Sequence, residues 1–350
     1  MSSTSRVHPR PGWRFAQATV LAVLALLLLV GPAQRADANP SFDREVVTGI
    51  NYNGSPGTAL DLYVPDYPGS AKLPLLIWSN GCAWFFACGR TGTLGIADEF
   101  NARGYAVAGV AVSGSGFGTT PFPRQLHDVR AAIRWLRENA DDFNLDPERF
   151  AIMGFSSGGW TSVIAGTTSD EAALPGEPNT NGLANGVSSA VQAAVGFSSP
   201  TDFLQMDQWH DNHPDVPDVI EHDAANSPES FLVGCQIQTC PAAVQRANPI
   251  TYVEGSDEAA TLLLHGFMDP LVPHGQSELL YAALAAAGNE VMFISTANAG
   301  HSPDQIRADE EFTVFHTNRG GNETIESMPP PTWDTIEHFI HVALSRARGS

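Results

Sequence analysis

The chain has 350 residues, of which 43% are hydrophobic and 16% charged, with 32 Gly and 25 Pro. This composition excludes a disordered chain, a coiled coil and a small scaffold held by disulfides, and the length suggests one domain with insertions. The formal net charge is −20, and Lys72 is the single lysine. Nucleic acid is therefore disfavoured as a partner, because an acidic surface repels phosphate backbones. The negative charge needs no binding partner to explain it, because net charge keeps a protein soluble.

The first 38 residues have the order of a secretory signal peptide. Three arginines precede an apolar run from Ala16 to Val30, and the segment ends in Ala36-Asp37-Ala38. The run is shorter than the ~20 residues that cross a bilayer comfortably, so an uncut membrane anchor is the weaker alternative. We expect cleavage after Ala38, secretion without stable membrane anchoring, and a folded domain over residues 39–350.

Four cysteines would enter an oxidising compartment on export and could pair there. They are clustered as Cys82 with Cys88 and Cys235 with Cys240, which favours those two disulfides. The sequence alone does not choose among the three connectivities that four cysteines allow. Zinc is a weaker alternative, since no histidine accompanies either pair, and we expect neither a metal nor a cofactor.

Short apolar segments predict the strands. Residues Arg44 to Val64 alternate in polarity around the turn Asn53 to Gly57, which predicts two strands. Later runs bounded by Gly, Pro or Asn are typical of strands buried on both faces of a mostly parallel sheet. These runs are Leu73 to Trp78, Tyr105 to Val112, Phe150 to Met153, Val191 to Phe197, Thr261 to Leu264 and Val291 to Ser295.

Helical patterns lie between these runs. Apolar residues recur at three- and four-residue steps in the first of them. The patterns cover Gln125 to Asn139, Ser157 to Thr167, Gly275 to Ala287 and Trp333 to Ala347. The alternation predicts an α/β fold, a doubly wound sheet with helices on both faces. Residues 168–188 and 199–249 are rich in Pro, Asn, Asp and Gly, and we interpret both as insertions over the carboxyl edge of the sheet, where ligands bind.

The segment Gly154-Phe155-Ser156-Ser157-Gly158 matches the pattern G-x-S-x-G. Such a turn between a strand and a helix holds the serine in a strained, exposed position, and its glycines let neighbouring backbone approach. The pattern alone is weak, but here a predicted strand precedes it and a predicted helix follows it. A near match at Ser198 lacks the second glycine and runs into proline, so we reject it.

A serine hydroxyl needs a base, and the base needs an acid that fixes its tautomer and stabilises its charged form. In this type of fold the order along the chain is Ser, Asp or Glu, His, each after a later strand. Asp269 follows the strand that ends at Leu264, and His301 follows the next strand. We therefore predict Ser156 as nucleophile, Asp269 as acid and His301 as base.

Other polar residues have more ordinary interpretations. His265 is expected to be a hydrogen-bonded structural residue and Asp202 a turn residue rather than an alternative acid. His210, His213 and His222 lie among aspartates like a metal cluster, but their irregular spacing favours a solvated insertion.

Acyl transfer also needs N–H donors aimed at the developing oxyanion. One donor should be the backbone N–H of Ser157, and another should come from the loop Ser79 to Trp84 after an early strand. A disulfide between Cys82 and Cys88 would pin this loop. Trp84, Phe85 and Phe86 would then line the acyl or leaving-group pocket, with core packing as the alternative.

The stretch from Phe122 to Leu136, continued from Asp146 into the serine turn, resembles secreted α/β-hydrolase esterases. The most similar group is the bidomain-feruloyl-esterase-like (BD-FAE-like) carboxylesterases, over about residues 55–305. The resemblance implies an α/β-hydrolase fold and the same three catalytic residues. The family's oxyanion loop His-Gly-Gly-Gly-Trp falls on Asn80-Gly81-Cys82-Ala83-Trp84, which implies that the N–H groups of Cys82 and Ala83 are the donors.

Together these patterns predict a secreted serine hydrolase that cleaves a small-molecule or polymeric carboxylic ester through an acyl-enzyme. Three alternatives stay open: a serine peptidase of the prolyl-oligopeptidase type, a polyester depolymerase, and a non-catalytic binding module on the same fold. An exposed cleft formed by Trp84, Phe85, Phe86 and Trp209 would favour the depolymerase. The sequence decides neither the ester nor the oligomeric state.

Overall fold

The computed structural model describes residues 43–55, 57–67, 71–169, 173–255, 258–318, 322–324 and 331–346. All of them belong to the unit Pro40–Ser350. The predicted signal peptide and the cleavage after Ala38 lie outside the described residues and stay predictions. Within the described ranges, no helix combines the length and the apolar character needed to cross a membrane.

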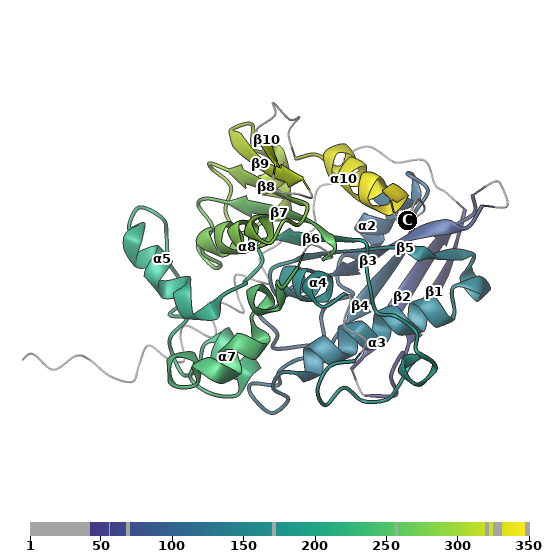
Figure 1. Ribbon diagram of the computed structural model, residues 1–350, viewed down its shortest axis with the longest axis horizontal. Helices are drawn as coiled ribbons and strands as arrows, with labels where there is room; N and C mark the ends of the chain where they lie inside the picture. The colour runs from purple at the N-terminus through teal and green to yellow at the C-terminus, as the bar shows by residue number, and fades with distance from the viewer. Residues whose placement is uncertain are drawn as a thin grey trace, which may run out of the picture. The chain divides into compact units, whose positions relative to one another are not determined.

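The described strands form one ten-stranded sheet in the order β1-β2-β4-β3-β5-β6-β7-β8-β9-β10 (Figure 1). The strands from β4 to β8 are parallel, and antiparallel pairs complete both edges. The bounds are β1 Arg44–Ile50, β2 Ala59–Pro65, β3 Leu73–Ser79, β4 Ala106–Ala111, β5 Leu145–Phe155, β6 Ala193–Phe197, β7 Ala260–Gly266, β8 Val291–Thr296, β9 Phe312–Asn318 and β10 Asn322–Thr324.

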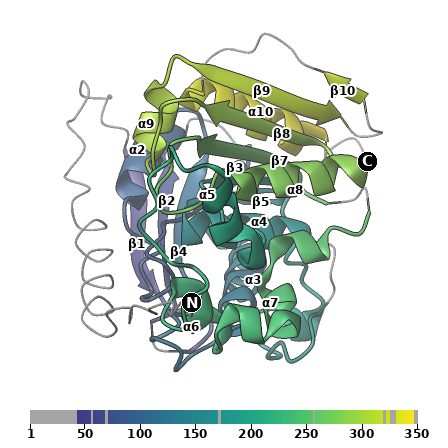
Figure 2. The same ribbon diagram turned by 90° about the vertical axis from the view of Figure 1, so that its left-hand side faces the viewer.

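Helices cover both faces of this sheet (Figure 2). One face carries α3 (Arg124–Glu138), α4 (Ser157–Thr167) and α8 (Gly275–Ala286), and the other carries α2 (Thr93–Asn101), α9 (Pro303–Ala308) and α10 (Trp333–Arg346). Successive side chains of a strand point to opposite faces. In β3, Ile77 accordingly belongs to the core on the side of α3 and α4, and Leu76 belongs to the core on the side of α2 and α10.

The predicted doubly wound α/β sheet is confirmed. Each predicted strand and helix is present, and α4 has the predicted bounds, although β5 begins earlier than predicted. The sequence analysis missed α2, α9, β9 and β10. The remaining short helices are η1 Asp141–Phe143, η2 Leu183–Asn185, η3 Phe203–Gln205, α5 Met206–Asn212, α6 Pro228–Val233, η4 Ile237–Thr239, α7 Pro241–Ala247 and η5 Pro249–Tyr252.

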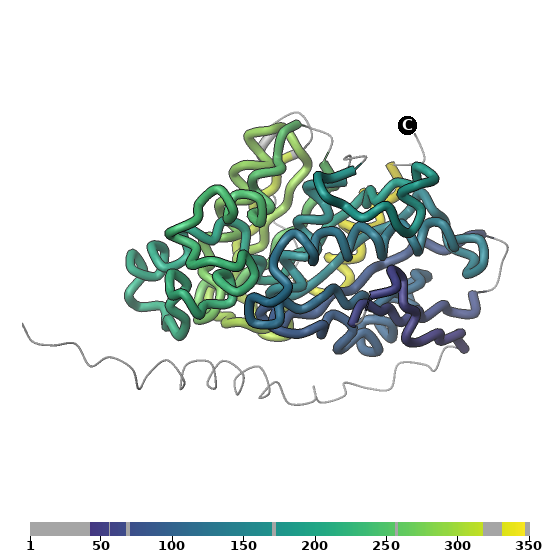
Figure 3. Tube along the Cα trace, turned by 90° about the horizontal axis from the view of Figure 1, so that it is seen from below, coloured from purple at the N-terminus to yellow at the C-terminus, as the bar shows by residue number. Residues whose placement is uncertain are grey.

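The two predicted insertions lie at different edges of the sheet. Residues 199–249 follow the carboxyl end of β6, as predicted, and form the green segment opposite the purple first strands in Figure 3. The placement of residues 168–188 at the carboxyl edge was wrong. Because α4 starts at the carboxyl end of β5 and runs back across the sheet, the described residues between α4 and β6 lie at the amino edge.

Arginines of α3 hold this first insertion. The Arg134 Nε donates to the carbonyl of Val187 at 3.1 Å, and the Arg137 Nη2 donates to that of Ala190 at 2.6 Å. Arg130 and Arg134 also pair with Glu177, and these three side chains are almost fully buried. Burial alone would raise the pKa of Glu177, but hydrogen bonds from Arg134 and Leu174 and both arginine charges lower it.

Candidate active site

The turn between β5 and α4 holds Ser156 in a strained backbone conformation. Its φ is 59° and its ψ is −126°, a region that residues other than glycine rarely adopt. The Ser156 N–H donates to the carbonyl of Phe197 at 2.9 Å. A Cβ on Gly158 would lie 2.0 Å from the Ser79 oxygen, so this position needs glycine. The turn therefore has the geometry expected of a nucleophile elbow.

Asp269 and His301 meet at the ends of β7 and β8. The His301 Nδ1 lies 2.7 Å from the Asp269 Oδ2, and the Asp269 Oδ1 accepts the N–H groups of Leu271 and Val272 at 2.9 Å each. The His301 ring centroid is 4.6 Å from that of Phe155, the residue before Ser156. An Nδ1–H donated to the carboxylate leaves the Nε2 of His301 able to accept a proton.

The carboxyl group of Asp269 is fully buried, and burial alone would raise its pKa. The charge on His301 and the hydrogen bonds from His265 and His301 act in the opposite direction and hold this pKa well below its usual range. Asp269 is therefore an anion throughout the neutral pH range, as an acid that orients a histidine must be.

The loop after β3 contacts the serine turn directly. A Cβ on Gly81 would lie 2.5 Å from the Cβ of Ser156, so only glycine allows this approach. The Cys82 N–H donates to the Ser157 Oγ at 3.0 Å. Ala83 and Trp84 follow with φ values of 55° and 57°, a conformation that strains both residues. We call residues 80–88 the oxyanion loop from here on.

The favoured disulfide pairing is confirmed. Cys82 is bonded to Cys88 and closes the oxyanion loop on itself. Cys235 is bonded to Cys240 in the second insertion, between α6 and α7. The two bonds close loops of similar length, but only the first lies beside the serine turn.

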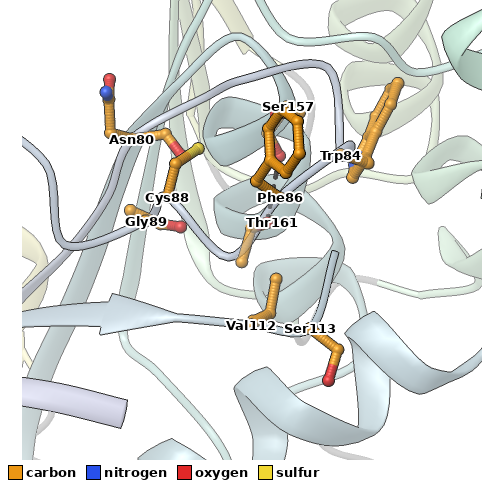
Figure 4. Close-up of a pocket in the computed structure, with 10 residues that line it drawn as sticks. Asn80, Trp84, Phe86, Cys88, Gly89, Val112, Ser113, Ser157 and Thr161 are labelled. Atoms are coloured by element: carbon orange, nitrogen blue, oxygen red, sulfur yellow. Dashed lines mark hydrogen bonds between the residues drawn. The ribbon is translucent and has the colours of Figure 1, made fainter. Parts of the chain in front are cut away.

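The oxyanion loop borders a small pocket, whose other walls come from α4 and the end of β4 (Figure 4). Trp84 and Phe86 line it, together with Ser157 and Thr161 of α4. Trp84 is only 4% exposed and packs edge-on against Trp160 at 5.7 Å, so it is also a core residue. Trp84 and Phe86 thus line this pocket, whereas the predicted role of Trp84, Phe85 and Phe86 in substrate binding stays a prediction.

Phe85 and Phe86 belong to an aromatic cluster that the sequence analysis did not find. Phe85 is buried and stacks on Phe117 at 4.9 Å, and Phe231 of α6 packs against both. Phe86 and Phe117 are 53% and 42% exposed and lie 5.9 Å apart. Phe117 stands between two glycines, the one local signal that could have marked it. Trp209 is not part of this cluster; it stacks on His213 at 3.9 Å.

The expected hydrogen bonding of His265 and the turn position of Asp202 are confirmed, and one interpretation of the other polar residues is wrong. The His265 ring is hydrogen-bonded on both nitrogens, and Asp202 caps η3 by accepting the N–H of Leu204. The interpretation of a solvated insertion fails for His210 and His222, which are 4% and 1% exposed. They are buried because α5 and the following loop pack under the Asp269 turn. No group of three or more metal-ligating side chains gathers within the described residues.

Comparison with known proteins places this geometry in a family. The profile of the BD-FAE family matches residues 60–284. "Esterase LipQ" of Mycobacterium tuberculosis is 29% identical over 242 residues, which are 69% of this chain and 52% of LipQ, so the chain spans about half of that relative's length.

Two solved structures are similar in fold. The "truncated form of carbohydrate esterase from gut microbiota" is 29% identical, with a TM-score of 0.65 over 77% of this chain and 93% of that one. MGS-M1, an "alpha/beta hydrolase enzyme from a Medee basin deep-sea metagenome library", has a TM-score of 0.53 at 18% identity over 87% of this chain and 100% of that one. These comparisons and the sheet described above confirm the α/β-hydrolase fold.

Proposed function

The chain belongs to the BD-FAE family, and on that premise we propose that it hydrolyses carboxylic esters through an acyl-enzyme at Ser156. The observation that carries the proposal is the buried 2.7 Å contact between His301 and Asp269, beside the strained serine turn. A histidine oriented by a buried carboxylate next to a strained serine is the arrangement that activates a hydroxyl nucleophile.

In the proposed reaction, the Ser156 Oγ attacks the ester carbonyl while the His301 Nε2 takes its proton. The resulting imidazolium is stabilised by Asp269 and returns the proton to the leaving alcohol oxygen as the ester bond breaks. Water then attacks the acyl-enzyme with His301 again as base, which releases the carboxylic acid and restores the Ser156 hydroxyl. Every proton is returned, so the cycle needs no cofactor.

The backbone N–H groups of Ser157, Cys82 and Ala83 are the proposed oxyanion donors. The close approach of the Gly81 backbone to Ser156 and the hydrogen bond from the Cys82 N–H to Ser157 place their loop beside the serine turn. The Cys82 N–H is already bonded to the Ser157 hydroxyl, so it must be shared with the oxyanion as the negative charge develops. Donors held in place in this way need little rearrangement in the transition state.

The finer part of the proposal concerns the substrate, for which we propose a bulky or polymeric ester. Phe86 and Phe117 expose two adjoining aromatic rings at the rim of the oxyanion loop. Neighbouring exposed rings of this kind favour contact with a large apolar group, and a small soluble ester would leave them unused. The exposed cleft of Trp84, Phe85, Phe86 and Trp209 that would favour the depolymerase is not found, because Trp84 and Phe85 are buried and Trp209 packs on His213, so the proposal of a bulky ester rests on Phe86 and Phe117.

The test is labelling with a fluorophosphonate probe, followed by a panel of p-nitrophenyl esters of rising acyl length. The wild type should be labelled, and Ser156→Ala should lose both labelling and at least about 10⁴-fold in kcat. A folded wild-type protein that resists the probe would contradict the proposal and favour the binding module. Hydrolysis of peptides but not of esters would favour the peptidase.

We also propose that the protein is secreted after removal of residues 1–38. The supporting observations are the signal-like order of the first residues and the two disulfides, which persist in oxidising compartments. Intact-mass analysis of exported protein should give a chain that starts at Asn39. Retention of the first 38 residues would contradict this part of the proposal.

A further inference from the structure

His265 is the last residue but one of β7, and its ring lies beside the turn that carries Asp269, which we call the acid turn. The ring is fully buried, as is the Asp269 carboxylate. Its Nε2 is 2.9 Å from the carbonyl oxygen of Val272 and 3.4 Å from the Asp269 Oδ2. Its Nδ1 is 2.8 Å from the Ser277 Oγ on α8. The ring thus bridges the acid turn to the helix that follows it.

These partners determine which ring nitrogen carries the proton. Two oxygen acceptors, a carbonyl and a carboxylate, face the Nε2, so a lone pair there would be repelled by both. A hydroxyl faces the Nδ1 and can donate to it. The ring therefore carries its proton on Nε2 and shares it between Val272 and Asp269, while Ser277 donates to the other side.

We propose that His265 is a positioning residue that fixes the Asp269 carboxylate and, through it, the ring of His301. The inference rests on the proposed function, because it assigns His265 a part in the reaction at Ser156. Three N–H donors other than His301 then surround the carboxylate, two on Oδ1 from Leu271 and Val272 and one on Oδ2 from His265. These contacts fix the orientation of the carboxylate, and they determine which lone pair of Oδ2 remains to accept the His301 N–H.

Two other histidines near Asp269 do not position its carboxylate. On α5, the His210 Nε2 faces the Asp269 backbone oxygen at 3.5 Å, and its Nδ1 is 3.4 Å from Asp218. On α8, His274 binds Glu278 at 3.1 Å and Ser295 at 2.8 Å. Neither of these rings donates to the carboxylate, so His265 is the side chain that competes with His301 for Oδ2 among the described residues.

The test compares His265→Met with His265→Gln in the protein expressed from the whole chain, with p-nitrophenyl acetate as substrate. The two replacements have nearly the same size, but only Gln keeps an N–H near the Nε2 position. The Met variant should lose about 10- to 100-fold in kcat with little change in KM, as expected for the loss of one hydrogen bond to a charged group. The Gln variant should recover most of this loss.

The pH profile separates positioning from a structural role. Without the N–H of His265, the carboxylate charge acts more fully on His301 and favours the protonated ring, so the acid limb of kcat/KM should move to higher pH in the Met variant. It should stay in place in the Gln variant. A structural role would lower the active fraction equally at every pH. Equal losses in both variants, or an unmoved acid limb, would overturn the proposal.

Folding is checked by thermal unfolding of both variants. If the Met variant does not fold, Ser277→Ala gives the same test, because it removes the hydroxyl that fixes the tautomer. This variant should lose several-fold in kcat and shift the acid limb in the same direction, and wild-type kinetics would overturn the inference. An unlabelled, inactive wild type would instead mean that the proposed function itself is wrong.

Discussion

The two halves of the candidate site are held in place by different means. In the acid turn, the Asp269 carboxylate accepts the backbone N–H groups of Leu271 and Val272 and is bonded to the His301 ring, all at ordinary hydrogen-bond distances. In the oxyanion loop, Ala83 and Trp84 have a strained, left-handed backbone conformation. The Cys82–Cys88 disulfide and the close approach of Gly81 to Ser156 hold the loop in this conformation. The acid turn should therefore be sensitive to loss of a charge, and the oxyanion loop to loss of a covalent bond.

The largest effect is expected from Asp269→Asn, which tests the acid turn. The amide cannot accept the His301 Nδ1–H as a carboxylate does, so the ring adopts the wrong tautomer and kcat should fall about 10⁴-fold. The measurement is steady-state kinetics on a p-nitrophenyl ester. Asp202→Asn is the control, because that carboxylate caps η3 and should leave kcat within a few-fold. Near-normal activity of Asp269→Asn would point to another acid.

Removing the Cys82–Cys88 bond by a double replacement with serine tests the oxyanion loop. We expect kcat to fall about tenfold or more, because displaced oxyanion donors stabilise the transition state less well. The matched control replaces Cys235 and Cys240, which close a loop of similar length in the second insertion. Each double variant should lose about 2 kcal/mol of stability, but only the first should lose activity. Equal activities would mean that the disulfide does not shape the oxyanion loop.

A smaller effect, on stability, is expected when the pH is changed, and it arises from His222 in the second insertion, residues 199–249. Burial lowers the pKa of His222, but the charge and the hydrogen bond of Glu229, with Asp207 and Asp218, raise it above the usual value of 6.5. A raised pKa in the folded state stabilises the fold below pH 6.5, and this stabilisation is lost as the pH rises through the folded-state pKa.

The measurement is the change in Tm between pH 5.5 and 8 for the wild type and for Glu229→Gln. Both proteins share all other titrating groups, so the difference between the two changes isolates the His222 pair. The wild type should lose more stability than Glu229→Gln as the pH rises. The reverse order would show that burial dominates at His222.

The smallest effect is expected from Ala83→Gly, which relieves strain without touching the disulfide. Glycine adopts the left-handed conformation freely but loses more chain entropy on folding, so the net gain should be about 0.5 kcal/mol. Ala131→Gly in α3 is the control and should lose about 1 kcal/mol. Urea denaturation measures both. A destabilised Ala83→Gly would mean that the loop conformation is not strained.

The predicted positions of Ser156, Asp269 and His301 depend on local pattern, and their catalytic roles stay predictions. Ser156 lies in a short motif between two strongly patterned elements, and Asp269 and His301 follow buried strands, so chain order was sufficient. The aromatic cluster brings Phe231 to Phe85 across the fold, and no local pattern reports such a contact. The burial of His222 was missed for another reason: its partner Glu229, close in the chain, offsets the cost of removing the ring from water.

The elements that the sequence analysis missed or misplaced also depend on their position in the fold. The strand β9 carries the mixed sequence Phe-Thr-Val-Phe-His-Thr-Asn, which is less apolar than the central strands because it lies near the edge of the sheet. The first insertion resembled the second in composition, and composition does not tell which end of a strand a loop joins. Its position follows only from counting strands and helices in order.

The arginines of α3 have an effect beyond the insertion they hold. Arg130 and Arg134 are 1% exposed, so part of the small stock of cations in a chain with a net charge of −20 faces inward. Both pair with Glu177 at the amino edge of the sheet, whereas the serine turn lies at the carboxyl edge, so these two cations offset little of the negative charge near Ser156. An approaching substrate thus meets a field more negative than uniformly distributed charges would produce, with a reach of about 8 Å at physiological ionic strength. If the proposed function is right, neutral esters should reach the serine without an electrostatic penalty and anionic esters should be repelled, and added salt should narrow the difference between their rates.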